Sequence, residues 1–241
     1  MLPQESRGRP RHISQRRILN ALCYLVVSGV QWRLLPREFP KWQLVYYHFR
    51  RWQQRGYWRR IYHVLRTLNR QAQGRHKHPT AGCLDSQSTP CSQVPGVRGY
   101  DKGKNVKGRK RHLLVDTQGL PLELVVTPAD VSDSAGVRLV WQRLGKRRGA
   151  AKKLRRVWVD AGYKAGAIAW CVQKRGVVLE VVVKERGQKG FVVQKRRWVV
   201  ERSFGWLNAQ RRLSRNYETL TQHSEGLAWI AFMRILIRRL A

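Results

Sequence analysis

The first seventy residues carry apolar positions at the three- and four-residue spacing of amphipathic helices. One helix is predicted after Ser14, a candidate N-cap, with a stop at Ser28-Gly29. A second is predicted from Trp42 to Gln54, and a third from Tyr57 through Leu68. The apolar positions are Ile18, Leu22, Leu25 and Val26, then Trp42, Val45, Phe49 and Trp52, then Ile61, Val64, Leu65 and Leu68. Three short helices with a basic surface resemble a helix-turn-helix domain, although a bundle that only packs against the rest is an alternative.

The remainder of the chain alternates strand and helix signals after a polar, aperiodic linker at residues 71–80. The predicted order is a strand at 81–86, a hairpin of 111–116 and 120–127, a helix at 137–144, a strand at 156–160, a helix at 165–174, a strand at 177–183 and a helix from 199. This order predicts an α/β domain over residues 81–241, in which helices flank a mixed sheet. A small all-α domain over residues 1–70 precedes it.

The charge balance indicates that this chain binds a polyanion. The chain has 49 Lys and Arg residues against 14 Asp and Glu, a formal net charge of +35. Double-stranded DNA is the expected partner, because phosphates bind Lys and Arg with release of counterions. No apolar run approaches the roughly 20 residues of a membrane span, and the four cysteines form no C-x-x-C pair. A cytoplasmic, nucleoid-associated protein without a small-molecule substrate is expected.

Three carboxylates are placed as a metal site would need them. Asp85 and Asp160 each follow an apolar strand, and Glu201 lies in the first turn of a predicted helix. Clustered carboxylates repel one another unless a cation lies between them, and oxygen ligands suit Mg²⁺ or Mn²⁺. Two such ions would support an in-line displacement at a phosphate. These residues are therefore the candidate catalytic and metal-binding groups.

Several polar residues are candidates for contact with DNA. The exposed side of the second helix is expected to carry Tyr47, His48, Arg50, Arg51 and Gln54. In the hairpin, Lys110, Arg111 and His112 are further candidates, although His112 is equally compatible with packing. Asp133 is interpreted first as the N-cap of the following helix.

Five segments together resemble the DDE transposases of bacterial and archaeal insertion sequences. They are CLDSQS at 83–88, KGRKRHLLVDTQGLPL at 107–122, VTPADVSDS at 126–134, VWVDAGY at 157–163 and RRWVVERSFGWLNAQRRLSRNYE at 196–218. The resemblance implies a ribonuclease H-like catalytic domain in which Asp85, Asp160 and Glu201 form the catalytic triad. It also implies cleavage at element ends, strand transfer into target DNA and a homodimer on DNA.

The resemblance is incomplete around the glutamate and at the start of the chain. Arg197 and Glu201 match the family signature, whereas Gln194 and Asn208 stand where tyrosine and lysine are usual. Arg197, Asn208 and Arg212 share a helical face with Glu201 and are candidates for DNA contact, with an Arg197–Glu201 ion pair as the alternative. Asp130 and Asp133 belong to a family-like motif. The family usually has a further helix before Leu2-Pro3, so a truncated copy, a second start site or the product of one reading frame is expected.

Three rival functions remain open from the sequence. A non-enzymatic basic nucleic-acid binder explains the charge but not the three carboxylates. A cleavage-defective transposase remnant would bind DNA without cutting it. A ribonuclease H-like repair or junction nuclease would cut without joining.

Overall fold

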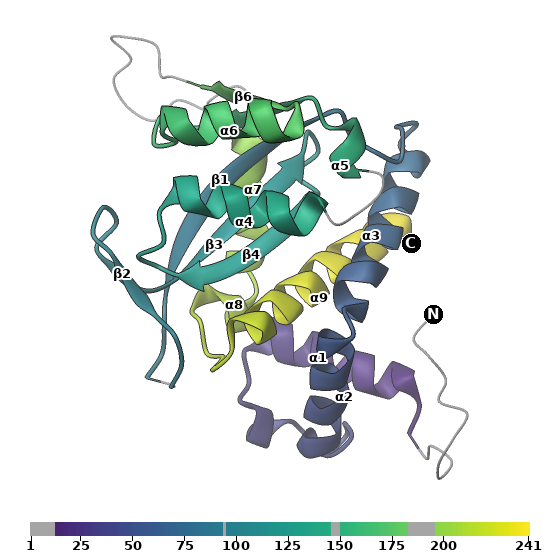
Figure 1. Ribbon diagram of the computed structural model, residues 1–241. Helices are drawn as coiled ribbons and strands as arrows, with labels where there is room; N and C mark the ends of the chain where they lie inside the picture. Colours follow the sequence, from purple (N-terminus) through teal and green to yellow (C-terminus); the bar gives the residue numbers. More distant parts are fainter. Residues whose placement is uncertain (1–12, 94, 146–149, 183–195) are drawn as a thin grey trace.

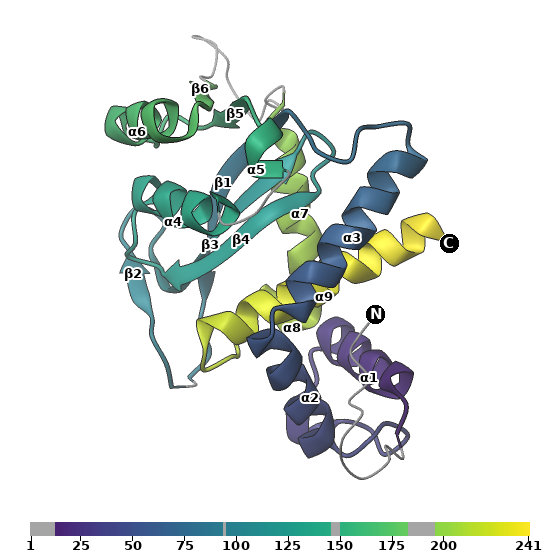
Figure 2. The same ribbon diagram turned by 45° about the vertical axis from the view of Figure 1, so that its right-hand side comes forward.

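The computed structural model describes residues 13–93, 95–145, 150–182 and 196–241. Within them, a six-stranded mixed sheet lies between two groups of helices (Figures 1 and 2). The strands are β1 (Ala81–Pro90), β2 (Gly99–Asp101), β3 (Val106–Asp116), β4 (Pro121–Pro128), β5 (Arg156–Val159) and β6 (Val178–Val181). The helices are α1 (Gln15–Ser28), the short η1 (Trp32–Leu34), α2 (Trp42–Gln54), α3 (Tyr57–Ala72), α4 (Asp133–Gly145), α5 (Ala150–Lys153), α6 (Ala165–Arg175), α7 (Trp198–Asn208), α8 (Arg211–Ser214) and α9 (Thr221–Leu240).

Strand β1 lies at the centre of the sheet. It pairs antiparallel with β3 on one side and parallel with β5 on the other, and β6 extends the parallel part to the edge. Strands β2 and β4 both pair with β3. Helices α4 and α6 cover one face, and α7 and α9 cover the other (Figure 2). The expected α/β architecture with a mixed sheet and flanking helices, preceded by a helical region, is confirmed.

The local signals for α1 are confirmed in detail. The Ser14 hydroxyl accepts a hydrogen bond from the Arg17 amide at 3.4 Å, as an N-cap does. Gly29 ends the helix with φ of 74°, a left-handed conformation that glycine adopts without steric cost. On α2, the predicted face is also confirmed, because Val45, Phe49 and Trp52 are buried.

The predicted face of α3 is wrong at two positions. Val64 and Leu68 are 57% and 50% exposed, whereas Arg66 and Arg70 are buried. The reason is a buried carboxylate, Asp116 at the end of β3, whose Oδ2 lies 2.5 Å from Arg70 Nη1. An ion pair therefore selects which side of α3 faces the core, and apolar residues are left on the outside.

The sequence interpretation missed α9, the longest helix that the structure describes. Residues from His223 to Met233 are buried without interruption, so no amphipathic period marks this helix. It packs along α3, as both ribbon views show (Figures 1 and 2), with the Tyr62 and Trp229 rings 4.9 Å apart. One apolar core thus joins α1–α3 to α7, α9 and one face of the sheet. The division into residues 1–70, a linker at 71–80 and 81–241 stays a prediction, and α3 extends to Ala72 within that linker.

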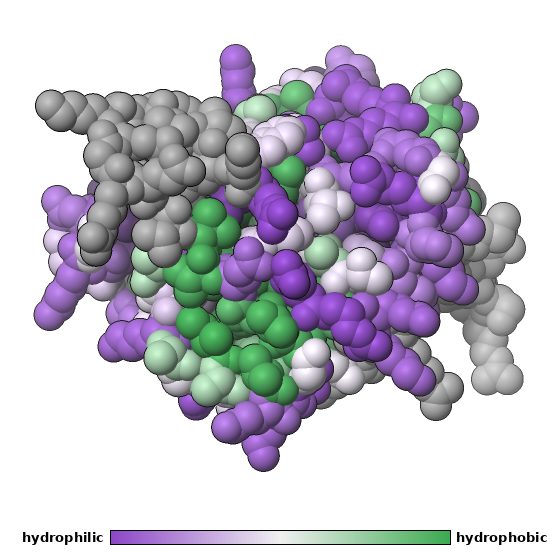
Figure 3. Space-filling model, turned by 90° about the horizontal axis from the view of Figure 1, so that it is seen from above, coloured by the Kyte–Doolittle hydropathy of each residue, from purple (hydrophilic) through white to green (hydrophobic). Residues whose placement is uncertain are grey.

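The face of the molecule seen from above is mostly hydrophilic (Figure 3). It carries one apolar patch near the end of the molecule that holds α6 and β6. Val172 and Val178 on these elements are 46% and 51% exposed. None of the described helices combines the length and the apolar character needed to cross a membrane.

Replacing Asp116 by alanine is expected to lower the free energy of unfolding by about 3–5 kcal/mol, because Arg70 would lose its partner in the core. Asp116 is 0% exposed and also accepts two backbone amides of the β3–β4 turn at 2.9 Å. As a control, Glu180→Gln removes a surface pair with Arg156 and should cost less than about 1 kcal/mol. Urea unfolding followed by circular dichroism measures the free energy of unfolding of both variants. Equal decreases in the two variants would contradict a stabilising role of the buried Arg70–Asp116 pair.

Candidate active site

Sheet register brings two of the three predicted carboxylates together. Strands β1 and β5 run parallel, and Cys83 is paired with Trp158. Asp85 in β1 and Asp160 directly after β5 each lie two residues further along, so they are neighbours across two strands that are about 4.8 Å apart. The Asp85 side chain is 14% exposed and that of Asp160 34%. The Ser86 amide donates to Asp85 Oδ1 at 2.7 Å, and the Gly162 amide donates to Asp160 Oδ1 at 3.0 Å.

A guanidinium group lies between these carboxylates. Arg197 Nη2 is 3.2 Å from Asp85 Oδ2 and 3.7 Å from Asp160 Oδ2. Arg197 immediately precedes α7, and Glu201 lies one turn further on as an exposed residue. Across the described ranges, no three His, Cys, Asp or Glu side chains form a group that could hold a metal ion. The structure therefore joins Asp85, Asp160 and Arg197 but leaves Glu201 apart from them.

The pKa of Asp85 is raised to about 6, because burial, with a smaller contribution from Asp160, outweighs the Arg197 guanidinium and the Ser86 amide, which lower it. A carboxyl in this position needs positive charge to stay ionised at neutral pH. Tyr163 is close to the aspartate pair. Burial raises the pKa of its phenol, and the neighbouring charges of Asp85, Asp133 and Asp160 raise it further. Its hydroxyl is buried without a hydrogen-bond partner among the described groups.

Next to the aspartate pair is a buried network that the sequence interpretation only partly found. Lys110 Nζ lies 3.1 Å from Asp101 Oδ2 and 3.2 Å from Asp133 Oδ1. Ser86, the neighbour of Asp85, donates its hydroxyl to Asp133 Oδ1 at 2.6 Å, and Ser88 donates to Asp101 Oδ2 at 2.5 Å. Burial raises the pKa of Asp101, but the hydrogen bonds from Ser88 and Lys110 outweigh it and leave that pKa below its ordinary value. The network ties β1 to β3 and α4 beside the site.

The role expected for Asp133 as an N-cap is wrong. Asp133 is the first residue of α4, and the Ser132 hydroxyl accepts the Ala135 amide at 3.2 Å instead. Its carboxylate is turned to Lys110 and Ser86, because these donors compete with the helix amides. Asp130, the other acid of this motif, is exposed.

Besides Lys110, three candidates for DNA contact are buried and have partners inside the protein. Arg111 Nη2 donates to the Leu213 carbonyl at 2.7 Å, and His112 Nε2 lies 3.0 Å from Thr127 Oγ1. Burial lowers the pKa of His112 to about 4, so the imidazole is neutral at pH 7. Arg212 Nη2 is 2.8 Å from Glu218 Oε1. We assign no DNA contacts to Lys110, Arg111, His112 or Arg212.

The other candidates lie at the surface. On α2, Tyr47 is 51% exposed, Arg50 is exposed, and Arg51 donates to the Tyr47 hydroxyl at 2.6 Å. His48, expected on the same side, is instead 9% exposed and packs against the Trp52 ring. The structure places Asn208 at the exposed end of α7, whereas Gln194 lies outside the described residues.

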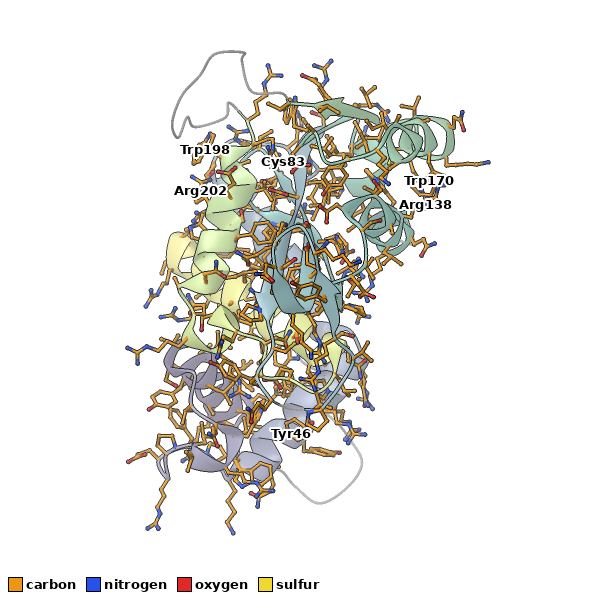
Figure 4. All side chains as sticks on the ribbon, turned by 90° about the vertical axis from the view of Figure 1, so that its left-hand side faces the viewer. Tyr46, Cys83, Arg138, Trp170, Trp198 and Arg202 are labelled. Carbon is orange, nitrogen blue, oxygen red and sulfur yellow. The ribbon has the colours of Figure 1, made fainter. Side chains whose placement is uncertain are left out.

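A stack of tryptophan and arginine side chains fixes α7, the helix of Glu201. Arg202 Cζ lies 4.4 Å from the Trp198 ring centroid and 5.0 Å from that of Trp206. Arg202 also donates to the Gln118 carbonyl in the β3–β4 turn at 2.8 Å. Figure 4 shows Trp198 and Arg202 along this helix, with Cys83 of β1 beside them. The Cys83 thiol donates to the Arg196 carbonyl at 2.9 Å, so β1 and the start of α7 are joined directly.

Comparison with known proteins identifies the family. A family model described as "Transposase DDE domain" matches residues 76–236, about two thirds of the chain. The chain belongs to this family. A second model, described as "Putative transposase of IS4/5 family", matches residues 1–62 of this DDE transposase chain.

A curated relative agrees with this assignment. It is the "Putative transposase for insertion sequence element IS402" of Burkholderia cepacia, which is 32% identical over 115 residues. The match covers 46% of this chain and 54% of the relative, so it spans about half of the relative's length. No solved structure gives a significant match.

Membership of the DDE transposase family implies dependence on a divalent metal, and the aspartate pair fits one. Both carboxylates already share a cation, since one guanidinium nitrogen lies within 4 Å of each. Carboxylate oxygens are the ligands that hard divalent cations prefer. The same geometry implies competition, because Arg197 and a metal ion would neutralise the same charges.

Arg197→Gln is therefore expected to bind Mn²⁺ at least about tenfold more tightly than the wild type without DNA, or about 1.4 kcal/mol. Removing the guanidinium leaves the aspartate charges to the metal alone. Isothermal titration with Mn²⁺ measures this affinity, and Asp160→Asn should weaken it. Arg156→Gln, on the exposed start of β5, is the matched control and should leave it unchanged. Weaker Mn²⁺ binding by Arg197→Gln would contradict the competition.

Proposed function

We propose that this protein is a transposase that cleaves DNA at the ends of an insertion element and joins those ends to target DNA. One observation carries the proposal: in a chain of this family, Asp85 within β1 and Asp160 directly after the parallel strand β5 lie side by side and share one cation. Neither the basic surface alone nor an ordinary surface ion pair requires that arrangement.

Asp85, Asp160 and Glu201 are the proposed ligands of Mg²⁺ or Mn²⁺, with two ions at the site. Bound divalent cations would make the attacking water more acidic and neutralise charge on the phosphate. Glu201 would join the aspartates from α7, where it follows Arg197 by one turn. Arg197 would leave the carboxylates and pair with a DNA phosphate, for which its planar guanidinium is suited.

The reaction has two displacements of the same kind. In cleavage, a water oxygen bonds to phosphorus while the bond to the 3′ oxygen breaks, which leaves a 3′-hydroxyl and a 5′-phosphate. In strand transfer, that 3′-hydroxyl oxygen bonds to a phosphorus of the target, whose own 3′ oxygen leaves and takes up a proton from solvent. The carboxylates position the reacting groups and form no covalent bond to DNA.

The proposed DNA contacts outside the site are made by Tyr47, Arg50 and Arg51 of α2 and by Asn208 of α7. These residues are at the surface of a strongly cationic protein. Pairing of two element ends requires two active sites, so a homodimer on DNA is proposed. Action in the cytoplasm, at the nucleoid, follows from this substrate.

The three carboxylates can be tested one by one. Asp85→Asn, Asp160→Asn and Glu201→Gln should each abolish cleavage and strand transfer in Mg²⁺ and in Mn²⁺, because each removes a proposed metal ligand at nearly constant size. DNA affinity should persist or rise, since negative charge near the phosphates is removed. The assay follows labelled element-end DNA on a gel, with melting temperature as the check on folding.

Glu180→Gln is the control for this series and should keep its activity, because Glu180 pairs with Arg156 at the surface. An Asp160→Asn protein that folds, binds DNA and still cuts at a comparable rate would refute the site. A wild type that binds element ends but never cuts them would be a cleavage-defective remnant, and one that cuts without joining would be a nuclease.

The salt dependence of DNA binding separates surface cations from buried ones. Each phosphate neutralised contributes about 0.9 to the slope of log affinity against log salt concentration. Arg50→Gln should therefore lower that slope by about 0.9, because Arg50 is exposed on α2. Lys110→Gln should leave the slope unchanged and lower the melting temperature, because Lys110 is buried and bridges Asp101 and Asp133. An equal effect of both substitutions on the slope would place Lys110 at the DNA.

A further inference from the structure

An aromatic hollow lies far from the aspartate pair, between the N-terminal helices and the turn that leads into α9. We call it the aromatic pocket; it is about 490 Å³ in volume and its principal lining residues are Trp32, Arg33, Trp42, Tyr46, Tyr217 and His223. This volume is in the range of sites for small organic groups. Figure 4 shows Tyr46 at the opposite end of the molecule from Cys83.

The rings in this pocket stand at angles that leave flat faces available. Trp32 and Tyr46 meet edge to face, with centroids 5.1 Å apart and planes at 74°. Tyr46 and His223 are perpendicular at 5.8 Å. The Arg33 guanidinium lies over the Trp42 ring at 5.8 Å. Such a set of aromatic faces with an adjoining cation is suited to stacking a planar, electron-rich ring.

Two polar atoms of the pocket wall lack partners. Trp32 Nε1 and His223 Nε2 are buried, and neither makes a hydrogen bond to a described protein group. The His223 side chain is only 3% exposed, and burial lowers its pKa, so the ring is neutral at pH 7 and its nitrogens can donate or accept. Simple apolar packing would not need these nitrogens at the wall of a hollow, whereas a ring with a polar edge would use them.

The charge around the pocket suits a phosphate chain. Two further hollows adjoin the aromatic pocket. The first shares Tyr46 with it, and the second shares Trp32, Arg33 and Tyr217 with it. The first adds Arg50, Arg51 and Arg55. The acidic residue in the aromatic pocket's lining is Glu218, which is 6% exposed and neutralised by Arg212. A groove of aromatic rings and arginines therefore runs across α2.

We propose that the aromatic pocket binds a nucleobase of an unstacked nucleotide while the neighbouring arginines hold its phosphates. The inference rests on DNA as the substrate. Its place relative to the active site follows from β1, because Cys91 after this strand bridges to Asn216, next to Tyr217. Six residues separate Asp85 from Cys91, which is about 20 Å of strand. At 3.4 Å per base pair, this length of strand corresponds to about six base pairs of DNA between the active site and the end of β1 next to the pocket.

The test uses the full chain with three probes: a labelled perfect duplex, the same duplex with one unpaired 2-aminopurine, and 2-aminopurine deoxynucleotide alone. Stacking of one base on aromatic side chains contributes about 1–3 kcal/mol, so the unpaired base should tighten binding about fivefold to a hundredfold. Its fluorescence should be quenched on binding. Tyr217→Leu should remove both effects and leave affinity for the perfect duplex unchanged.

Controls separate the pocket from general DNA binding. Tyr24→Leu changes a tyrosine of α1 that is 40% exposed and does not line the groove, and it should preserve the preference. Arg33→Gln should weaken binding to both duplexes and retain a preference between them. If Tyr217→Leu lowers the melting temperature, Trp42→Leu tests the same ring set.

The binding results with the three probes either support or overturn the nucleobase pocket. Quenching of the free deoxynucleotide with an affinity near that of the unpaired base would support a nucleobase site but assign it to free nucleotides. Equal affinity for the two duplexes, without binding of the free deoxynucleotide, would overturn the pocket and leave DNA binding intact. Failure to bind any DNA would overturn the proposed function itself.

Discussion

Repulsion between two carboxylates on neighbouring strands is the constraint on which the active site depends. Asp85 and Asp160 are fixed by the register of β1 and β5, and the backbone gives them no freedom to separate. The fold meets this cost with Arg197, whose position at the start of α7 is secured from β1 through Cys83 and from the β3–β4 turn through Arg202. A metal-dependent phosphoryl transferase needs the same arrangement. Two adjacent carboxylates require a cation to offset their repulsion, and a divalent metal ion can take that role in place of Arg197.

The scarce acids explain how a chain with a net charge of +35 folds at all. Asp116, Glu123, Glu218 and Glu225 are buried and each is paired with an arginine, which for all but Glu218 comes from a distant part of the chain. These pairs join α3, α4 and α9 to the sheet. These four acids are thus used in the interior, and the cations in excess remain at the surface, where a polyanion can neutralise them.

The sequence predicted what depends on local chemistry. The caps of α1, the face of α2, the hairpin turn and the position of Asp160 after a strand all have short-range signals. The end predicted for the first strand at residue 86 was wrong, since β1 continues to Pro90 and Asp85 lies within it. The sequence interpretation also failed where long-range partners decide. The sequence does not show that Arg66 and Arg70 point inward, that Lys110 bridges Asp101 and Asp133, or that Arg111 and Arg212 are buried. The reason is that an arginine or lysine has the same sequence pattern whether its partner is a phosphate or an internal carboxylate. Helix α9 was missed for the opposite reason, since burial on all sides removes the periodicity that marks a surface helix.

The shared core has a mechanical consequence for the proposed function. Helices α1–α3 would be a separate DNA-reading unit if they had their own core, but their apolar residues pack against α9, which also covers the sheet. The turn into α9 carries Tyr217, and its neighbour Asn216 bridges to Cys91 at the far end of β1 from the linker. Between α2 and the aspartate pair there is therefore a continuous path of packed helix and paired strand. Sites connected in this way keep a fixed spacing, so the distance along DNA between a contact at α2 and the reacting phosphate is set by the length of β1 rather than by a flexible tether.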